Sequence, residues 1–289
     1  MKESVRDSAV ALYDRYTHEG LDRRAFMAEL TRIAGSSAAA ATLLAGIAAD
    51  PAAAAVVPAN DRRVRGRDVE WTVAGGRRMK GYQVQPAAAK SRAAVMVIHE
   101  NRGLTEHIRD VARRAALAGY TALAPDFLTT KGGTPADQDA ARTLIGKLDL
   151  ATTVQDAVAT LDWLRGQTGG RVGIVGFCWG GAMVNRVAVA AGPKLDAGVS
   201  FYGPAPSPAE AGKVIAPLLI QLAEKDARVN ASALPWVAAL RAAGKQVRAI
   251  NYPGVDHAFH NDTSAERYNK QAADRAWAST LAFFRQHLT

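Results

Sequence analysis

The chain has 289 residues, of which 48% are hydrophobic and 22% are charged, as in an ordinary globular protein. Its formal net charge is +9, but the basic residues are scattered and not interleaved with aromatic ones, which favours a solvated positive surface over nucleic-acid binding. The single cysteine, Cys178, excludes an intramolecular disulfide and a cysteine-based zinc cluster. The six histidines lack the HExxH spacing of many zinc enzymes, so we expect no metal site.

Residues 1–55 differ from the rest of the chain. Arg23 and Arg24 are followed two places on by Phe26, then by a soft apolar stretch and an alanine run that ends near Ala55. This order is typical of a twin-arginine export signal with an Ala-x-Ala cleavage site. It predicts a periplasmic or extracellular protein that contacts the export machinery transiently, with a linker at 56–66. A cytoplasmic location is the alternative.

The same N-terminal segment allows other interpretations. Its apolar stretch is too short and too weakly hydrophobic for a membrane span, and is otherwise an Ala-rich helix that stays attached. Before the arginines, Val10, Tyr13 and Tyr16 have helical spacing, as in an extended signal or a small docking helix.

From residue 67 to the C-terminus at 289, predicted strands and helices alternate. The strands are expected at 68–73, 79–85, 93–99, 120–124, 171–176, 197–202, 217–223 and 246–252, with the first two antiparallel. The helices are expected at 108–118, in the stretch ending at 148, and at 154–164, 179–191, 232–243 and 272–287. The continuous apolar run at 93–99 is typical of a strand covered on both faces. The pattern predicts one α/β domain: a doubly wound, mostly parallel sheet with helices on both faces.

The strongest motif is Gly176-Phe177-Cys178-Trp179-Gly180-Gly181, between a predicted strand and a predicted helix. A nucleophile elbow needs small residues two places either side of the nucleophile, because a Cβ would clash there. The thiol would lie at a helix N-terminus, where the helix dipole favours the thiolate. We predict that Cys178 is the nucleophile; the alternative is a buried cysteine beside a glycine-rich turn.

A nucleophile of this kind needs an acid and then a histidine, in that chain order. Asp226 and His257 follow the last two predicted strands, and sites in open α/β sheets lie at such strand ends. His257 would take the thiol proton, and Asp226 would orient the imidazole. Glu224 is a rival acid and His260 a rival base.

The loop after the first central strand reads His99-Glu100-Asn101-Arg102-Gly103. In nucleophile-elbow enzymes this loop supplies one oxyanion-hole N–H, and the residue after the nucleophile supplies the other. Here those residues are Asn101 and Trp179. Glu100 is unusual at this place, and could also be a solvated loop acid.

Together these segments resemble the dienelactone hydrolase family, over about residues 64–289. The resemblance is carried by residues 98–103, Ala124-Pro125-Asp126, residues 176–181, Phe201-Tyr202-Gly203, Asp226 and His257-Ala258-Phe259. It implies an α/β-hydrolase fold, a Cys178–His257–Asp226 triad, no cofactor, and hydrolysis of an unsaturated lactone carboxylate. It also implies that Glu100 contacts the resting thiol and gates it until substrate enters.

One departure concerns the substrate. Characterised family members bind the substrate carboxylate with two arginines, one after the Ala-Pro-Asp segment and one four residues after the catalytic histidine. Here the first region offers only Lys131, and the second position is Asn261. Arg102 or Lys131 could substitute, although lysine lacks the planar fork that matches a carboxylate. Other candidate substrate contacts are Tyr202, Phe259 and Asn261.

The sequence therefore predicts a hydrolase of small carboxylic esters or lactones, from an exported branch of the family. A thioesterase or peptidase of the same fold is the nearest alternative, and a homologue that binds small molecules without turnover is another. A redox-sensing thiol is disfavoured because the chain has no resolving cysteine.

Overall fold

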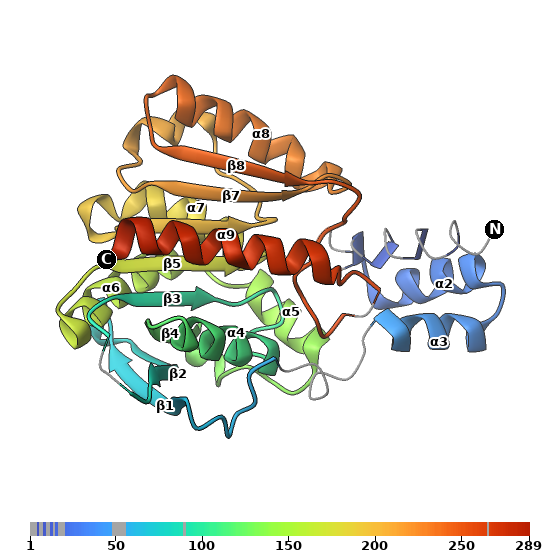
Figure 1. Cartoon of the computed structure of the whole chain (residues 1–289). Helices are drawn as coiled ribbons and strands as arrows, with labels where there is room; N and C mark the ends of the chain where they lie inside the picture. The colour runs from blue at the N-terminus through green and yellow to red at the C-terminus, as the bar shows by residue number, and fades with distance from the viewer. Residues whose placement is uncertain are drawn as a thin grey trace.

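The computed structural model describes residues 5, 8, 9, 12, 13, 15, 16, 21–47, 56–88, 91–264 and 266–289. Their strands form one eight-stranded sheet in the order β1-β2-β4-β3-β5-β6-β7-β8 (Figure 1). These strands are β1 (Val64–Thr72), β2 (Arg78–Pro86), β3 (Ala94–Ile98), β4 (Thr121–Asp126), β5 (Val172–Phe177), β6 (Ala197–Phe201), β7 (Leu218–Ala223) and β8 (Val247–Tyr252). β2 pairs antiparallel with β1 and β4, and every other neighbouring pair is parallel. The predicted mostly parallel sheet is confirmed.

Helices cover both faces of the sheet. In the described part of the chain they are α2 (Arg23–Ala34), α3 (Ser37–Ile47), α4 (Glu106–Leu117), α5 (Gln138–Gly146), α6 (Leu150–Thr168), α7 (Trp179–Ala190), α8 (Ala227–Ala242) and α9 (Lys270–Leu288). Short 3₁₀ turns lie at η2 (Ala74–Gly76), η3 (Thr129–Lys131), η4 (Gly192–Lys194) and η5 (Pro208–Lys213). The structure therefore has the three layers of a doubly wound fold.

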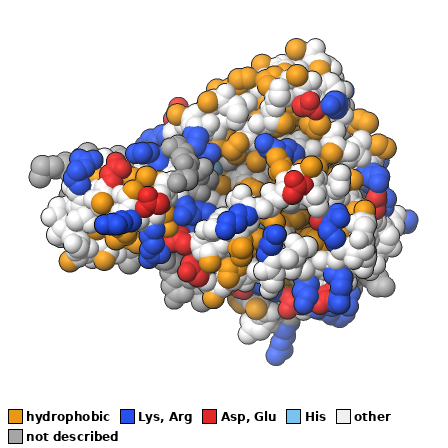
Figure 2. All heavy atoms as spheres, turned by 180° about the vertical axis from the view of Figure 1, so that it is seen from behind, with side chains coloured by type: hydrophobic (Ala, Val, Ile, Leu, Met, Phe, Trp, Pro, Cys, Tyr) orange, Lys and Arg blue, Asp and Glu red, His pale blue; other side chains and the backbone are white. Residues whose placement is uncertain are grey.

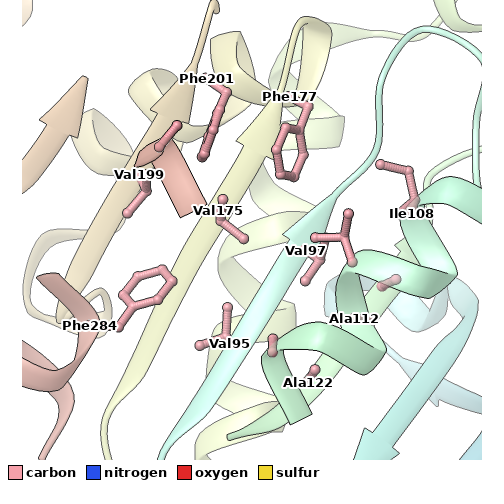
Figure 3. Close-up of a cluster of buried hydrophobic side chains, with 14 of the residues drawn as sticks. Val95, Val97, Ile108, Ala112, Ala122, Val175, Phe177, Val199, Phe201 and Phe284 are labelled. Atoms are coloured by element: carbon pink, nitrogen blue, oxygen red, sulfur yellow. The ribbon is translucent and has the colours of Figure 1, made fainter. Parts of the chain in front are cut away.

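The core consists of two apolar layers, one on each face of the sheet. Along β3, Val95 and Val97 pack with α4 and α9, whereas Met96 and Ile98 pack with α6, α7 and α8. Successive side chains of a strand point to opposite faces, so an apolar residue is needed at every position of β3. Figure 3 shows the first layer, where Phe284 of α9 lies on the valines of the central strands.

The described residues between 5 and 47 form a separate helical lobe, hereafter the N-terminal lobe. It has a small apolar core of its own, made by Ala9, Leu12, Tyr13, Tyr16, Phe26, Leu30 and Ala40. The Asp22 side chain accepts the first amides of α2, and Gly35, with φ 81°, ends that helix. Figure 1 places the lobe beyond the carboxyl ends of β3, β5 and β7.

The N-terminal sequence features have these positions in the structure. Arg23 and Arg24 occupy the first turn of α2, and much of the soft apolar stretch forms α3. The predicted cleavage region falls at 48–55, outside the described residues. Among the helices described, none combines the length and apolar character that membrane crossing requires. β1 begins at Val64, inside the stretch predicted to be a linker.

Candidate active site

Cys178 lies on the sharp turn between β5 and α7. Its backbone has φ 55° and ψ −113°, a strained conformation for a residue with a side chain. A Cβ on Gly176 would lie 2.1 Å from the carbonyl oxygen of Gly180, and a Cβ on Gly180 would lie 2.3 Å from that of Ile98. The two glycines are therefore required by the close approach of backbones, as the elbow motif predicts.

His257 and Asp226 form a buried pair. Nδ1 of His257 lies 2.5 Å from Oδ2 of Asp226, and both side chains are 1% exposed. Burial lowers the pKa of His257, but the negative charges of Cys178 and Asp226, with hydrogen bonds to both, raise it well above its ordinary value. Burial raises the pKa of Asp226, and the His257 charge outweighs this and lowers it. The structure thus brings Cys178, His257 and Asp226 together as a thiol, an imidazole and a carboxylate.

Asp226 is held in place by the helix that follows it. Its Oδ1 accepts the amide of Val229 at 3.0 Å, so the carboxylate caps α8 with one oxygen and reaches His257 with the other. The rival acid Glu224 is exposed and accepts the amide of Gly254 at 2.7 Å. Its carboxylate therefore shapes the loop after β8.

The rival base His260 is a core residue. Its ring lies 5.0 Å from that of Phe177 and 5.1 Å from that of Phe201, between centroids. Burial, followed by the positive charges of His107 and Arg114, holds its pKa well below the ordinary value. His260 is therefore a neutral, packed imidazole.

Glu100 is a buried carboxylate in the loop after β3. Its Oε2 accepts a hydrogen bond from Nδ2 of Asn261 at 2.7 Å, and its Oε1 has no hydrogen-bond partner among the described residues. Burial raises the pKa of Tyr202 well above its ordinary value, and the negative charges of Glu100 and Cys178 raise it further. Tyr202 is therefore a neutral phenol, and its ring lies 5.0 Å from that of His257.

A cavity of about 670 Å³ opens at Cys178. Asn101 and Trp179, the predicted oxyanion-hole residues, both line it. Its walls are mainly apolar, with Leu21, Ile145, Leu148, Leu150 and Met183. Such a cavity is large enough for a small organic ester.

Three arginines that the sequence interpretation missed also line this cavity: Arg142, Arg186 and Arg228. Arg186 had a detectable signal, because residues 178, 182 and 186 follow helical spacing and share one face of α7. Among the described residues no three His, Cys, Asp or Glu side chains are grouped to hold a metal ion.

The sequence also offered five other candidate substrate contacts. Arg102, Lys131, Tyr202, Phe259 and Asn261 are all absent from the cavity lining. The Arg102 side chain turns to Asp139, at 2.9 Å, and Lys131 ends the turn η3. Phe259 is fully buried in the core, and Asn261 is engaged by Glu100.

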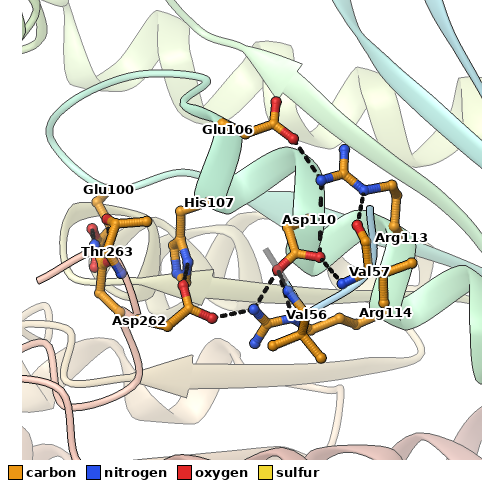
Figure 4. Close-up of polar contacts among 11 residues, drawn as sticks. Val56, Val57, Glu100, Glu106, His107, Asp110, Arg113, Arg114, Asp262 and Thr263 are labelled. Atoms are coloured by element: carbon orange, nitrogen blue, oxygen red, sulfur yellow. Dashed lines mark hydrogen bonds and ion pairs between the residues drawn. The ribbon is translucent and has the colours of Figure 1, made fainter. Parts of the chain in front are cut away.

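The loop that carries His257 and Asn261 is anchored on α4 through Asp262 (Figure 4). Oδ1 of Asp262 forms a hydrogen bond of 2.7 Å with Nδ1 of His107, and its other carboxylate oxygen forms an ion pair with Arg114. Burial raises the pKa of Asp262, but these contacts outweigh it and lower the pKa to about 2. Arg114 also pairs with Asp110, which accepts the amides of residues 56 and 57. This network was not predicted from the sequence.

Comparisons with known proteins agree with this geometry. The profile of the Dienelactone hydrolase family matches residues 79–288. "Protein usf" of Aquifex pyrophilus is 33% identical over 74% of this chain and 96% of its own length. A protein of Escherichia coli, provisionally named a carboxymethylenebutenolidase, is 32% identical over 73% of this chain and 84% of its own length.

Solved structures show the same fold. A crystal structure from Klebsiella pneumoniae, provisionally titled a dienelactone hydrolase, superposes with a TM-score of 0.69 at 30% identity. It covers 77% of this chain and 100% of its own. A dienelactone hydrolase structure from Anabaena variabilis has a TM-score of 0.64 at 22% identity, and covers 78% of this chain and 100% of its own.

Proposed function

The chain belongs to the dienelactone hydrolase family and has its α/β-hydrolase fold, and on that premise we propose that it hydrolyses carboxylic esters or lactones with Cys178 as nucleophile. The observation that carries the proposal is the strained backbone of Cys178 beside the buried His257–Asp226 pair. Strain of this kind is retained where it serves a function. Three groups in the order of nucleophile, acid and base fit acyl transfer.

The proposed reaction has two halves. The Cys178 thiolate attacks the ester carbonyl while His257 carries the thiol proton, and the amides of Asn101 and Trp179 stabilise the oxyanion. The intermediate collapses to a thioester on Cys178, and His257 gives its proton to the leaving alkoxide. Water, deprotonated by His257, then attacks the thioester and releases the carboxylic acid and the thiol.

Glu100 has a proposed role in the resting state. A carboxylate near the thiol disfavours the thiolate, because two negative charges repel one another in a buried site. Glu100 would thus keep Cys178 protonated until a substrate displaces the carboxylate and lets the thiolate pair with His257.

We do not extend the proposal to the family's unsaturated lactone carboxylate as the specific substrate. Characterised members bind that carboxylate with arginines, and this chain has Lys131 and Asn261 in those regions. We further propose that the protein is exported by the twin-arginine route, on the strength of Arg23, Arg24 and the apolar stretch after them.

The test is a kinetic screen of lactones, aryl esters, thioesters and peptides on the purified full chain. Cys178→Ala should abolish hydrolysis, and Asp226→Asn should lower kcat/KM by roughly 10³- to 10⁴-fold. The matched control is Glu224→Gln, which alters the neighbouring exposed acid and should change kcat/KM by less than about threefold. Full activity in Cys178→Ala would refute the proposal. A preference for thioesters or peptides would place the enzyme in a different acyl class.

A further inference from the structure

Three arginines from three separate segments of the hydrolase domain face the N-terminal lobe. Arg102 follows Asn101, and its Nη2 donates a hydrogen bond of 2.8 Å to the hydroxyl of Tyr13. Arg267, from the segment before α9, lies 5.1 Å from the centre of the same ring. Arg142 of α5 lies 3.9 Å from the centre of the Tyr16 ring. The three guanidinium groups thus contact the two tyrosines: Arg267 and Arg142 lie over the rings, and Arg102 donates to the hydroxyl of Tyr13.

The lobe also forms part of the Cys178 cavity. Leu21 and Asp22 line that cavity together with Arg142. Arg23 forms an ion pair of 2.7 Å with Asp139, whose other oxygen holds Arg102 at 2.9 Å. Figure 2 shows Lys and Arg side chains along the junction of the lobe with the body of the molecule. Contacts at the junction are therefore polar and specific, and they reach the entrance to the site.

The tyrosines are presented by a packed unit. The ring of Tyr16 stacks on that of Phe26 at 4.3 Å, and Tyr13 meets Phe26 edge-on at 6.0 Å. Both rings are thereby fixed on the side of the lobe that faces the arginines. A packed unit loses less conformational entropy on docking than a loose tail does.

One of the three arginines, Arg142, is incompletely satisfied by this contact. Nε of Arg142 is buried and has no hydrogen-bond partner in the described part of the chain. An aromatic ring attracts a guanidinium, but it supplies no negative charge and no bidentate acceptor. A carboxylate would supply both, so the surface that Tyr13 and Tyr16 cover is chemically suited to anions.

We propose that the N-terminal lobe is a removable cap on the Cys178 cavity, docked through Tyr13 and Tyr16, and that its release opens an anion-attracting rim of Arg102, Arg142 and Arg267. The lobe is joined to the body through residues 48–55, where the sequence predicts cleavage on export. Control of access to the thiol does not depend on the reaction; the effect on turnover rests on the proposed function.

The test uses two alkylating agents of similar size and different charge on the full chain. Cys178 is the only cysteine, so the rate of alkylation reports access to one atom. In the double variant Tyr13→Ala/Tyr16→Ala, neutral iodoacetamide should react at least roughly threefold faster than in the wild type. Anionic iodoacetate should gain about threefold more than that, and salt should diminish the extra gain, because uncovered arginines attract anions. Thr42→Ala, an exposed change on α3, is the matched control and should leave both rates unchanged.

Hydrogen exchange of α5 and of the lobe provides the second measurement. Faster exchange in the double variant, with unchanged melting of the body, shows that the lobe has undocked. Undocking without faster alkylation, or no alkylation in any form, would overturn the cap. Exchange equal to that of the wild type would overturn docking through the tyrosines. If the alkylation rates change as expected but the protein hydrolyses no ester, the proposed function is wrong and the cap proposal stands.

Discussion

Asp262→Asn tests whether the ion pairs of the loop after β8 stabilise the fold. The pKa of Asp262 is lowered from 3.8 to about 2, so its ionisation favours the folded state by about 2 kcal/mol at neutral pH, at 1.36 kcal/mol per pKa unit. Asparagine keeps the shape and removes the charge that Arg114 and His107 face. We expect urea melts at pH 7 to show a loss of about 2 kcal/mol in the free energy of unfolding.

The pH dependence has a definite sign. Because the folded-state pKa of Asp262 is the lower one, its contribution is complete above the unfolded value near 3.8 and disappears as the pH falls through about 2. The gap between wild type and variant should stay nearly constant from pH 7 to 4 and shrink to roughly half by pH 3. Asp274→Asn is the control, because its ion pair with Lys270 is exposed to solvent and its loss should leave the free energy of unfolding nearly unchanged. A gap that is negligible at pH 7, or equal at pH 7 and pH 3, would contradict this reasoning.

Three further results are expected. In Glu100→Gln, iodoacetamide should alkylate the thiol faster at pH 7 and the thiol pKa should fall while ester turnover drops; unchanged alkylation would make Glu100 a simple loop acid. Gly180→Ala should lower the free energy of unfolding by at least about 2 kcal/mol, because its Cβ would lie within 2.6 Å of two backbone oxygens, whereas Gly166→Ala, in open space on α6, should raise it by about 0.5–1 kcal/mol in the same urea melts. Replacing both Arg23 and Arg24 by lysine should leave the product in the cytoplasm, as measured by cell fractionation; unchanged export would show that the segment is not a twin-arginine signal.

The fold was predictable because each central strand carries its own local signal. Residues 93–98 are apolar at every position, and the structure buries β3 on both faces. The elbow was predictable for a related reason. The backbone contacts at Gly176 and Gly180 leave no room for a Cβ, so the fold requires glycine at both positions and the motif is visible in the sequence. Both signals are local, and neither depends on knowing the rest of the chain.

Helix starts were less predictable. The helix expected at 232–243 begins at Ala227, directly after Asp226. Asp226 is both a helix cap and a candidate catalytic acid. The sequence prediction interpreted it only as the acid and so missed the helix start. Pro235 lies inside this helix. Because proline is most common in the first turn of a helix, it favours a predicted helix start close to residue 235.

Contacts between distant loops could not be predicted from local patterns. Asp262 and His107 are 155 residues apart, and neither has neighbours in sequence that indicate pairing. The same holds for Arg102, which lies in the predicted oxyanion loop and was therefore a candidate for binding the substrate. Its direction is decided by Asp139 and Tyr13, and both partners belong to other segments.

Backbone strain in the described structure is concentrated around the candidate triad. Among the described residues, the non-glycine ones with positive φ are Cys178 at 55°, Tyr202 at 37° and Ala258 at 63°. A side chain in this region costs free energy, so the surrounding structure must impose it. The imposing contacts come from neighbouring strands: the amide of Cys178 donates to the carbonyl of Phe201 at 3.0 Å, and that of Tyr202 donates to Gln221 at 2.8 Å. Cys178 and Tyr202 are thus each held by the next strand of a parallel sheet, so the sheet that builds the core also fixes the orientation of the thiol against its histidine.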